Sequence, residues 1–259
     1  MRKCSTTLAT GKLFYPRERE QKMATIESAR AASLVDAEQK AIQLFTEIER
    51  TLIRPGVSEK TLSDEIHALG VERFNVRTHW HKRLIRSGPN TLRPFDDNPP
   101  DRIIEEDDIL VVDLGPVFEE WEADFGRTYV LGNDPKKILL RDALEPIWFQ
   151  VKDWYYQQQS TKTGDEGVTG EELYAYACET AEKAGFKFGA PIAGHIVGSF
   201  PHERIPRDKI TLYITKGNNE AMTRPGKGGH LRHWILEIHL HDPAGEFGGF
   251  MEQILTAGY

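Results

Sequence analysis

The ribbon "VVDLGPVFEEWEADFGRTYVLG", Val111 to Gly132, constrains this chain more than any other stretch. Its two runs of Val, Phe, Tyr and Leu predict an inward-facing hairpin, yet each carries an aspartate, Asp113 or Asp124. With a turn near Phe118 and Glu119, we expect the two aspartates to lie directly opposite each other. Their Cβ atoms would then be about 4.5 to 5.5 Å apart on one face of the sheet.

A second ribbon, "HWILEIHLHDPAGEFGGFMEQILTA", repeats this arrangement near the carboxyl terminus. It turns at "DPAG", residues 242–245, which places Glu237 opposite Glu252. Two carboxylates about 5 Å apart repel by about 3 kcal/mol at an effective dielectric constant of ~20, so something must neutralise them. A shared proton could serve one pair, whereas four converging carboxylates fit divalent cations better. A solvated strand residue is the ordinary alternative for any one of these acids.

Helices are predicted before each ribbon. Apolar residues recur at helical spacing over residues 33–52, and Ser58 is a typical N-cap for a second helix that ends at Gly70. Residues 78–102 form an irregular stretch around one short strand, because turn signals surround it.

The second half has the same order of elements. Pro135 opens a helix with a predicted bend at Pro146, and Thr169 with Glu172 forms a capping box for a helix that closes at Gly185. Helix, helix and β ribbon therefore occur twice, which predicts one compact α/β domain of two similar halves.

Composition narrows the possible partners. The net charge of -7 argues against nucleic acid and anionic membranes. The two cysteines, Cys4 and Cys178, form no CxxC pair and fit a reducing cytoplasm. The aromatic cluster at 147–156 is typical of a helix packing face or a dimer surface, and we expect a homodimer.

The segment "GHIVGSFPHERIP", Gly194 to Pro206, adds His195 and His202. A neutral imidazole binds Zn, Mn, Co or Fe, and a second histidine nearby can donate a hydrogen bond to a substrate oxygen. Two hydrogen-bonded loop histidines are the alternative interpretation.

At this point the sequence resembles the pita-bread metallohydrolases, which include methionyl aminopeptidase, Xaa-Pro aminopeptidase, prolidase and creatinase. The segments "VDLGP", "ADFGRTYVLG", "GHIVGSFPHERIP", "LEIHL" and "FMEQILT" stand in that family's order. The resemblance implies an α/β pita-bread fold with two pseudo-symmetric halves around a curved antiparallel sheet. It makes residues 33–259 the catalytic domain and residues 1–32 an N-terminal extension.

The same resemblance implies two divalent ions, of Mn, Co, Zn or Fe. Asp113 would bind one ion, His195 and Glu237 the other, and Asp124 and Glu252 would bridge both. A hydroxide held between the ions would attack the substrate carbonyl, and Glu237 would pass a proton to the leaving amine.

Substrate binding is where the sequence departs from the family. His202 matches the family's second histidine and would hold the substrate carbonyl or the tetrahedral intermediate. Phe95, however, stands where the family has a substrate-binding histidine. Either His79 or His81 replaces it, or the pocket accepts a different substrate.

A second departure follows Glu237, because Ile238 stands where the family usually has proline. His239 and His241 share the face of Glu237 at the strand period of two, so they either line the pocket or cap its rim. We expect His239 to contact substrate.

Three functions are compatible with these residues. The first is a dinuclear peptidase of the Xaa-Pro aminopeptidase type. The second is a creatinase-like hydrolase or lyase of a small non-peptide metabolite, and the third is an inactive binding module on the same fold. The complete ligand set argues against the third.

Overall fold

The computed structural model describes residues 16–162, 166–200, 209–226 and 229–258, with side chains from residue 21 onward. Its helices are α1 (Pro16–Thr51), α2 (Glu59–Phe74), η1 (Gly88–Leu92), α3 (Pro135–Thr161), α4 (Gly170–Lys183) and η2 (Ile210–Leu212). Its strands are β1 (Leu84–Ser87), β2 (Ile109–Leu114), β3 (Val117–Phe118), β4 (Trp121–Glu122), β5 (Phe125–Val130), β6 (Lys187–Phe188), β7 (Ile192–Val197), β8 (Tyr213–Thr215), β9 (His233–His241) and β10 (Gly248–Ile254).

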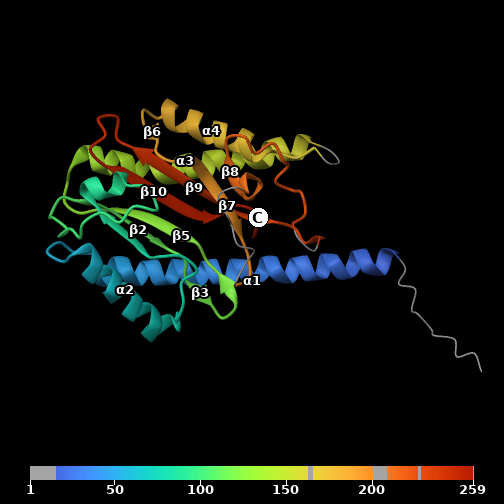
Figure 1. The fold of residues 1–259 in the computed structure, drawn as a ribbon, viewed down its shortest axis with the longest axis horizontal. Helices are drawn as coiled ribbons and strands as arrows, with labels where there is room; N and C mark the ends of the chain where they lie inside the picture. Colours follow the sequence, from blue (N-terminus) through green and yellow to red (C-terminus); the bar gives the residue numbers. More distant parts are fainter. Residues whose placement is uncertain (1–15, 163–165, 201–208, 227–228, 259) are drawn as a thin grey trace, which may run out of the picture.

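A mixed α/β architecture with one central sheet results. Within the described residues, eight strands form this sheet in the order β1-β2-β5-β10-β9-β7-β8, with β6 paired to β9. All the pairs are antiparallel, and β3 with β4 forms a separate two-stranded ribbon. The predicted order of helix, helix and ribbon is found in both halves, and β5 meets β10 where the halves join (Figure 1).

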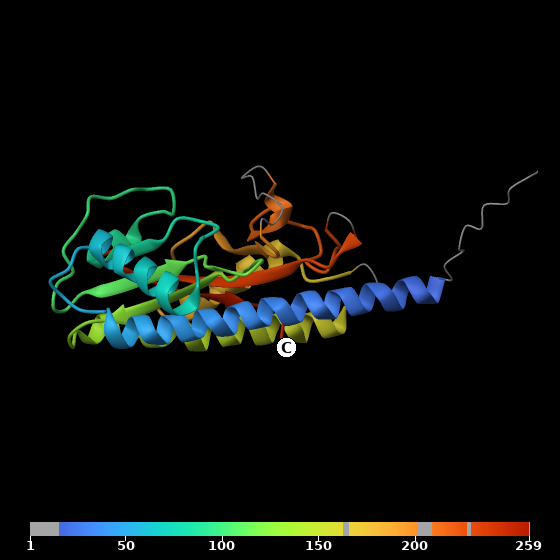
Figure 2. The same cartoon turned by 90° about the horizontal axis from the view of Figure 1, so that it is seen from below.

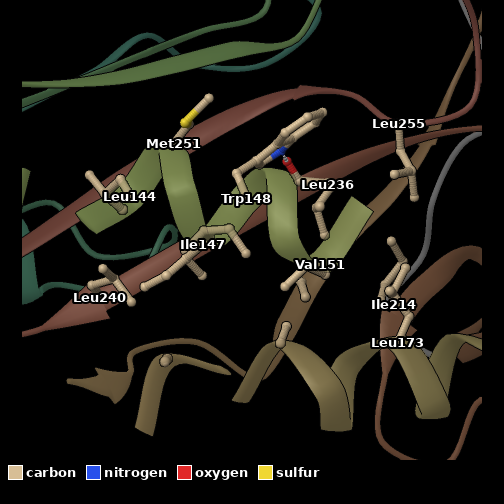
Figure 3. Close-up of a cluster of buried hydrophobic side chains, with 14 of the residues drawn as sticks. Leu144, Ile147, Trp148, Val151, Leu173, Ile214, Leu236, Leu240, Met251 and Leu255 are labelled. Atoms are coloured by element: carbon tan, nitrogen blue, oxygen red, sulfur yellow. Dashed lines mark hydrogen bonds between the residues drawn. The ribbon is translucent and has the colours of Figure 1, made fainter. Parts of the chain in front are cut away.

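The long helices cover one side of the sheet. Figure 2 shows α1 and α3 running along the same side. Figure 3 shows the core of the second half, in which apolar side chains of α3 pack on β9 and β10. Trp148 is fully buried there, and its indole N–H donates to the carbonyl of Leu236 at 2.9 Å. The aromatic cluster at 147–156 is therefore mainly a core face, although Phe149 is exposed.

The first helix is longer than the apolar spacing predicts. It begins at Pro16 rather than near Ser33, so its amino-terminal end extends past the sheet (Figures 1 and 2). Proline is favoured in the first turn of a helix, and the following Arg, Glu, Lys and Ala residues are good helix formers. They carry few large apolar side chains, which is why core spacing did not reveal them. The expected boundary at residue 32 falls inside α1.

Local end signals are confirmed with one exception. The Ser58 hydroxyl accepts from the Thr61 N–H, and the capping box before α4 is present. The prediction that the second helix ends at Gly70 is wrong, because α2 continues to Phe74 and stops at Asn75 in the left-handed conformation, φ 55°. The α3 helix continues through Pro146. No helix in the described part of the chain is both long and apolar enough to cross a membrane.

The register of the second ribbon agrees with the sequence, and that of the first does not. Glu237 pairs with Glu252 as predicted. Asp113, however, pairs with Gly126 rather than with Asp124, because the tip turns at Glu119 and the next residue instead of at 118 and 119. Glu119 has φ 58°, a left-handed conformation that usually requires Gly or Asn, so the sequence carried no signal for a turn at this position. The shift is two residues, so Asp124 keeps its predicted face.

Candidate metal centre

Three acidic residues lie in one row across four neighbouring strands. Asp113 of β2 pairs with Gly126 of β5, and Gly126 pairs in turn with Glu252 of β10. Glu252 pairs on its other side with Glu237 of β9. Because paired residues point to the same face, the row gathers the carboxylates. A Cβ atom on Gly126 would lie 2.2 Å from the Phe250 ring, so this position requires glycine.

Asp124 joins two groups of metal-ligating atoms. It immediately precedes β5 and lies two residues before Gly126, hence on the same face. The first group consists of Asp124, His81 and Asp113, and the second of Asp124, His195 and Glu252. Within each group the ligand atoms lie within 4.8 Å of one another. Asp124 is thus the residue that the two groups have in common.

His195 enters the centre from β7. Its Nε2 lies 3.3 Å from Oδ2 of Asp124 and 3.7 Å from Oε1 of Glu237. Its Nδ1 lies 2.8 Å from the Ile196 carbonyl, which only accepts, so Nδ1 carries the proton and Nε2 faces the acids. Gly194 permits this approach, since φ is 135° and a Cβ atom there would lie 2.2 Å from a carbonyl oxygen of β9.

Of the two histidines proposed to replace the one missing at Phe95, the structure brings His81 to the centre. Its Nε2 lies 3.1 Å from Oδ1 of Asp124 and 3.6 Å from Oδ1 of Asp113. Burial opposes protonation of this ring, but the two carboxylates outweigh it and raise the pKa of His81 to about 9. His79 instead lies beside α2, and burial lowers its pKa to about 3.

The region around Phe95 also differs from the family pattern. Phe95 is 49% exposed, and its ring centroid lies 5.9 Å from that of His81. The two rings are therefore neighbours, although the phenyl ring can neither donate a hydrogen bond nor bind a metal.

His239 supports Glu237 from the same strand. Its Nε2 lies 2.8 Å from Oε2 of Glu237. Burial raises the pKa of Glu237, but the hydrogen bond from His239 and nearby positive charges outweigh burial, so the pKa lies below its ordinary value. His241 packs on Gly189, where a Cβ atom would lie 2.4 Å from the imidazole. His202 lies outside the described residues.

Trp80 is the residue that sequence reasoning missed. Its ring meets that of His81 edge to face at 4.5 Å between centroids, and that of His195 at 5.3 Å. The one available signal was its place between the two histidines of "THWHKR". The indole therefore contacts both of the imidazoles that approach Asp124.

Four ionised carboxylates in this centre repel one another, and their full ionisation is unfavourable without additional positive charge. Burial, together with the charges of other acids, raises the pKa of Asp113 to about 7, although His81 opposes this. Burial and the charges of Asp124 and Asp113 raise the pKa of Glu252 well above its ordinary value. In the folded chain, Asp113 and Glu252 would therefore ionise readily only beside additional positive charge.

Three carboxylate oxygens in this centre lack a hydrogen-bond donor within the described part of the chain. Among the described residues, Oδ1 of Asp113, Oδ2 of Asp124 and Oε2 of Glu252 are buried and accept no hydrogen bond. Buried oxygens of this kind are costly unless a cation or donor satisfies them. Carboxylate oxygens with imidazole nitrogens suit Mn, Co, Zn or Fe, so the residues fit divalent metal.

Comparisons with known proteins agree with this chemistry. The chain matches the sequence model of metallopeptidase family M24 over residues 32–230, a range that includes Asp113, Asp124 and His195 but ends before Glu237 and Glu252. It is 26% identical over 153 residues to the Xaa-Pro dipeptidase of Lactobacillus helveticus, covering 58% of this chain and 39% of that protein. The chain spans less than half the length of the curated relatives it matches.

Solved structures show the same fold. The X-Pro aminopeptidase of Thermotoga maritima matches with a TM-score of 0.66 at 18% identity, over 92% of this chain and 65% of that one. The prolidase of Pyrococcus horikoshii matches with a TM-score of 0.61 at 20% identity, over 92% and 58%. The predicted pita-bread fold is thereby confirmed. Because the family model covers most of the sequence and its residues converge on one acidic centre, this chain belongs to metallopeptidase family M24.

Proposed function

We propose that this protein is a dinuclear metal-dependent hydrolase that cleaves peptide bonds as an Xaa-Pro aminopeptidase or dipeptidase. The observation that carries the proposal is the place of Asp124, which belongs to both groups of potential ligands. A carboxylate with two oxygens facing two such groups is the arrangement that bridges a pair of ions. The names of the matched relatives support the Xaa-Pro class of substrate.

The ligands divide between two positions. Asp113 would hold one ion, and His195 with Glu237 would hold the other, while Asp124 and Glu252 would contact both. Divalent Mn, Co, Zn or Fe ions bound there would polarise the substrate carbonyl and activate a water molecule. Two ions would bring four positive charges to four carboxylates, which removes the repulsion among them.

Glu237 is suited to move the proton that the leaving amine requires. Its pKa lies below the ordinary value despite burial, so it is ionised at neutral pH and can accept a proton. The hydrogen bond from His239 fixes its Oε2 at 2.8 Å and orients the carboxylate. His239 therefore acts on substrate through Glu237 in this proposal, and His202 would hold the substrate oxygen.

Metal content tests the proposal directly. Protein purified from medium supplemented with Mn²⁺ or Co²⁺ should contain up to two ions per chain by elemental analysis. Asp124→Asn should lose them, because the amide retains one weak acceptor and no charge. Asp142→Asn, on the exposed surface of α3, makes the same chemical change as a control and should retain them. Wild-type protein without metal under these conditions contradicts the dinuclear proposal.

Substrate class requires a separate assay. Metal-loaded protein should hydrolyse Xaa-Pro dipeptides or peptides with proline in the second position faster than matched peptides with alanine there. Asp124→Asn should abolish this turnover, and Asp142→Asn should preserve it. Metal binding without peptide turnover refutes the peptidase proposal.

One observation favours a second candidate function. Phe95 replaces a substrate-binding histidine of the family and lies beside His81. This change favours a creatinase-like hydrolase or lyase that acts on a small non-peptide amide or amidine. Turnover of such metabolites in place of peptides would establish it. Metal binding with no turnover in either panel would leave the inactive binding module.

Three further sequence predictions belong to this proposal. We expect the protein to act in the cytoplasm and to form a homodimer, with residues 33–259 as its catalytic domain. Light scattering coupled to size-exclusion chromatography measures the mass in solution, and a mass of 29.5 kDa, that of one chain, would rule out the dimer.

A further inference from the structure

We propose that Nε2 of His81 is a ligand of the metal ion held by Asp113 and Asp124. This inference rests on the proposed metal centre and adds one residue to it. The five ligands implied by the family resemblance supply only carboxylates to this ion. With His81, each of the two positions would have one imidazole.

Geometry places His81 inside the ligand group and not at its rim. The side chain is 7% exposed, and Nε2 lies 3.1 Å from Oδ1 of Asp124 and 3.6 Å from Oδ1 of Asp113. The ligand atoms of these three residues lie within 4.8 Å of one another, as do those of the group that contains His195. Oδ1 of Asp113 accepts no hydrogen bond among the described residues, so this corner retains an unused acceptor.

The hydrogen bond on the far side of the ring fixes its tautomer. Nδ1 of His81 lies 2.7 Å from the Lys82 carbonyl, which only accepts, so Nδ1 carries the hydrogen. Nε2 is therefore the ring atom that faces the carboxylates of Asp113 and Asp124, and either a proton or a metal ion can lie between them. A backbone carbonyl behind the ring is the usual support of a metal-bound histidine.

His195 shows the same arrangement on the opposite side. There Nδ1 lies 2.8 Å from the carbonyl of the following residue, as it does in His81, and Nε2 faces Oδ2 of Asp124 at 3.3 Å. His81 faces Oδ1 of the same carboxylate. Asp124 therefore presents one oxygen to each imidazole, and the Trp80 ring contacts both of them.

Backbone hydrogen bonds fix the segment that carries His81 to the residues that follow β2. The Trp80 N–H donates to the Gly115 carbonyl at 2.9 Å, and the Val117 N–H donates to the Thr78 carbonyl at 3.0 Å. A Cβ atom on Gly115 would lie 2.2 Å from Cδ2 of His81, so only glycine admits the ring. His81 is thus positioned by Gly115 and Val117, which follow Asp113 closely in the chain.

Removal of the imidazole is the first arm of the test. Wild type and His81→Ala are loaded with Co²⁺, and affinity is measured by isothermal titration calorimetry together with the visible d–d absorption of the bound ion. We expect wild type to bind two Co²⁺, and the variant to lose about tenfold or more in affinity for one of them. The absorption of that ion should change as well, because a nitrogen ligand is lost.

Two further variants separate binding from folding. His81→Phe keeps an aromatic ring beside Trp80 and Phe95, so it preserves packing if the alanine variant does not fold. It should show the same loss of Co²⁺ affinity. His67→Ala removes an imidazole from α2 in the same half and should leave both affinities and the absorption unchanged.

The outcomes distinguish the two proposals. Wild type that binds no metal overturns the proposed function and this inference together. Wild type that binds two ions, beside His81→Phe with unchanged affinities and spectrum, overturns only the assignment of His81. Increased affinity in the variant also overturns it, because His81 would then be a cationic partner of the carboxylates that metal must displace.

Discussion

Replacing Glu252 by glutamine should stabilise the metal-free protein and destabilise the metal-loaded one. Glu252 is 2% exposed, and its ligand oxygen lies within 4.8 Å of that of Asp124. Two unit charges at this separation repel by about 3 kcal/mol at an effective dielectric constant of 20. Glutamine keeps the size and removes the charge. Because burial and the charges of Asp124 and Asp113 already raise the pKa of Glu252, protonation relieves part of this repulsion in wild type, and we expect a gain of about 1 to 3 kcal/mol at pH 8.

Metal reverses the order of stabilities. An ion that binds only the folded state adds RT ln(1 + [M]/Kd), which is about 2.7 kcal/mol at a hundredfold excess over Kd. Wild type should receive this gain, whereas Glu252→Gln would lack a ligand that we propose both positions share and should receive little of it. Urea unfolding followed by circular dichroism, in EDTA and in excess Mn²⁺, measures both free energies of unfolding.

A buried carboxylate outside the centre provides the control. Glu59 of α2 accepts hydrogen bonds from the backbone and hydroxyl of Ser87 and from the amide of Asn90. Glu59→Gln should therefore change stability by the same amount with and without metal. Should Glu252→Gln lower the stability of the metal-free protein as it lowers that of the loaded protein, the electrostatic reasoning is wrong.

Three other substitutions test separate parts of the structure. Burial raises the pKa of Glu38 above its usual 4.5, although the Ile254 N–H donates a hydrogen bond to its carboxylate. The folded state therefore binds the carboxyl proton more tightly than the unfolded state does. Wild-type stability consequently falls as the pH rises from 4.5 through the folded pKa. Glu38→Gln lacks this loss, and urea unfolding at pH 5 and pH 8 should show its relative stability rising by up to about 1.4 kcal/mol per pH unit over that interval. Asn75→Ala should cost about 1 to 2 kcal/mol in the same assay, because alanine tolerates φ 55° poorly, whereas Asn75→Gly should not. Gly115→Ala should displace His81 and weaken one of two Co²⁺ binding steps in calorimetry, and unchanged binding would show that the ring can move aside.

The two ribbons show how far sequence can predict this site. The second has a simple turn, in which the Gly245 N–H donates to the Asp242 carbonyl, and this turn fixes Glu237 opposite Glu252. The first ends in a small ribbon of its own, whose Glu119 has a left-handed conformation without a Gly or Asn signal. Its register was therefore predicted two residues away, and only the alternation of faces preserved the position of Asp124.

The choice between His79 and His81 depended on contacts distant in sequence. The two residues are separated by one position, so periodicity alone gives no reason to prefer either. Gly115 decides between them, because it leaves space for the ring of His81 and pairs with the neighbouring backbone. Likewise, the sequence gives no sign that Gly126 is needed, because the Phe250 ring that fills the space at this glycine comes from β10, the strand that pairs with it. Such residues acquire their meaning only from the neighbour that packs on them.

The row of carboxylates also lies across the junction between the two halves of the chain. Asp113 and Asp124 belong to the first half, Glu237 and Glu252 to the second, and the halves meet where β5 pairs with β10. Bringing such distant segments together costs loop-closure entropy in every folding event. An ion held from both sides would act as a removable cross-link across this junction. Metal would then make the two halves unfold as a single cooperative unit, and chelation would let them separate in two steps.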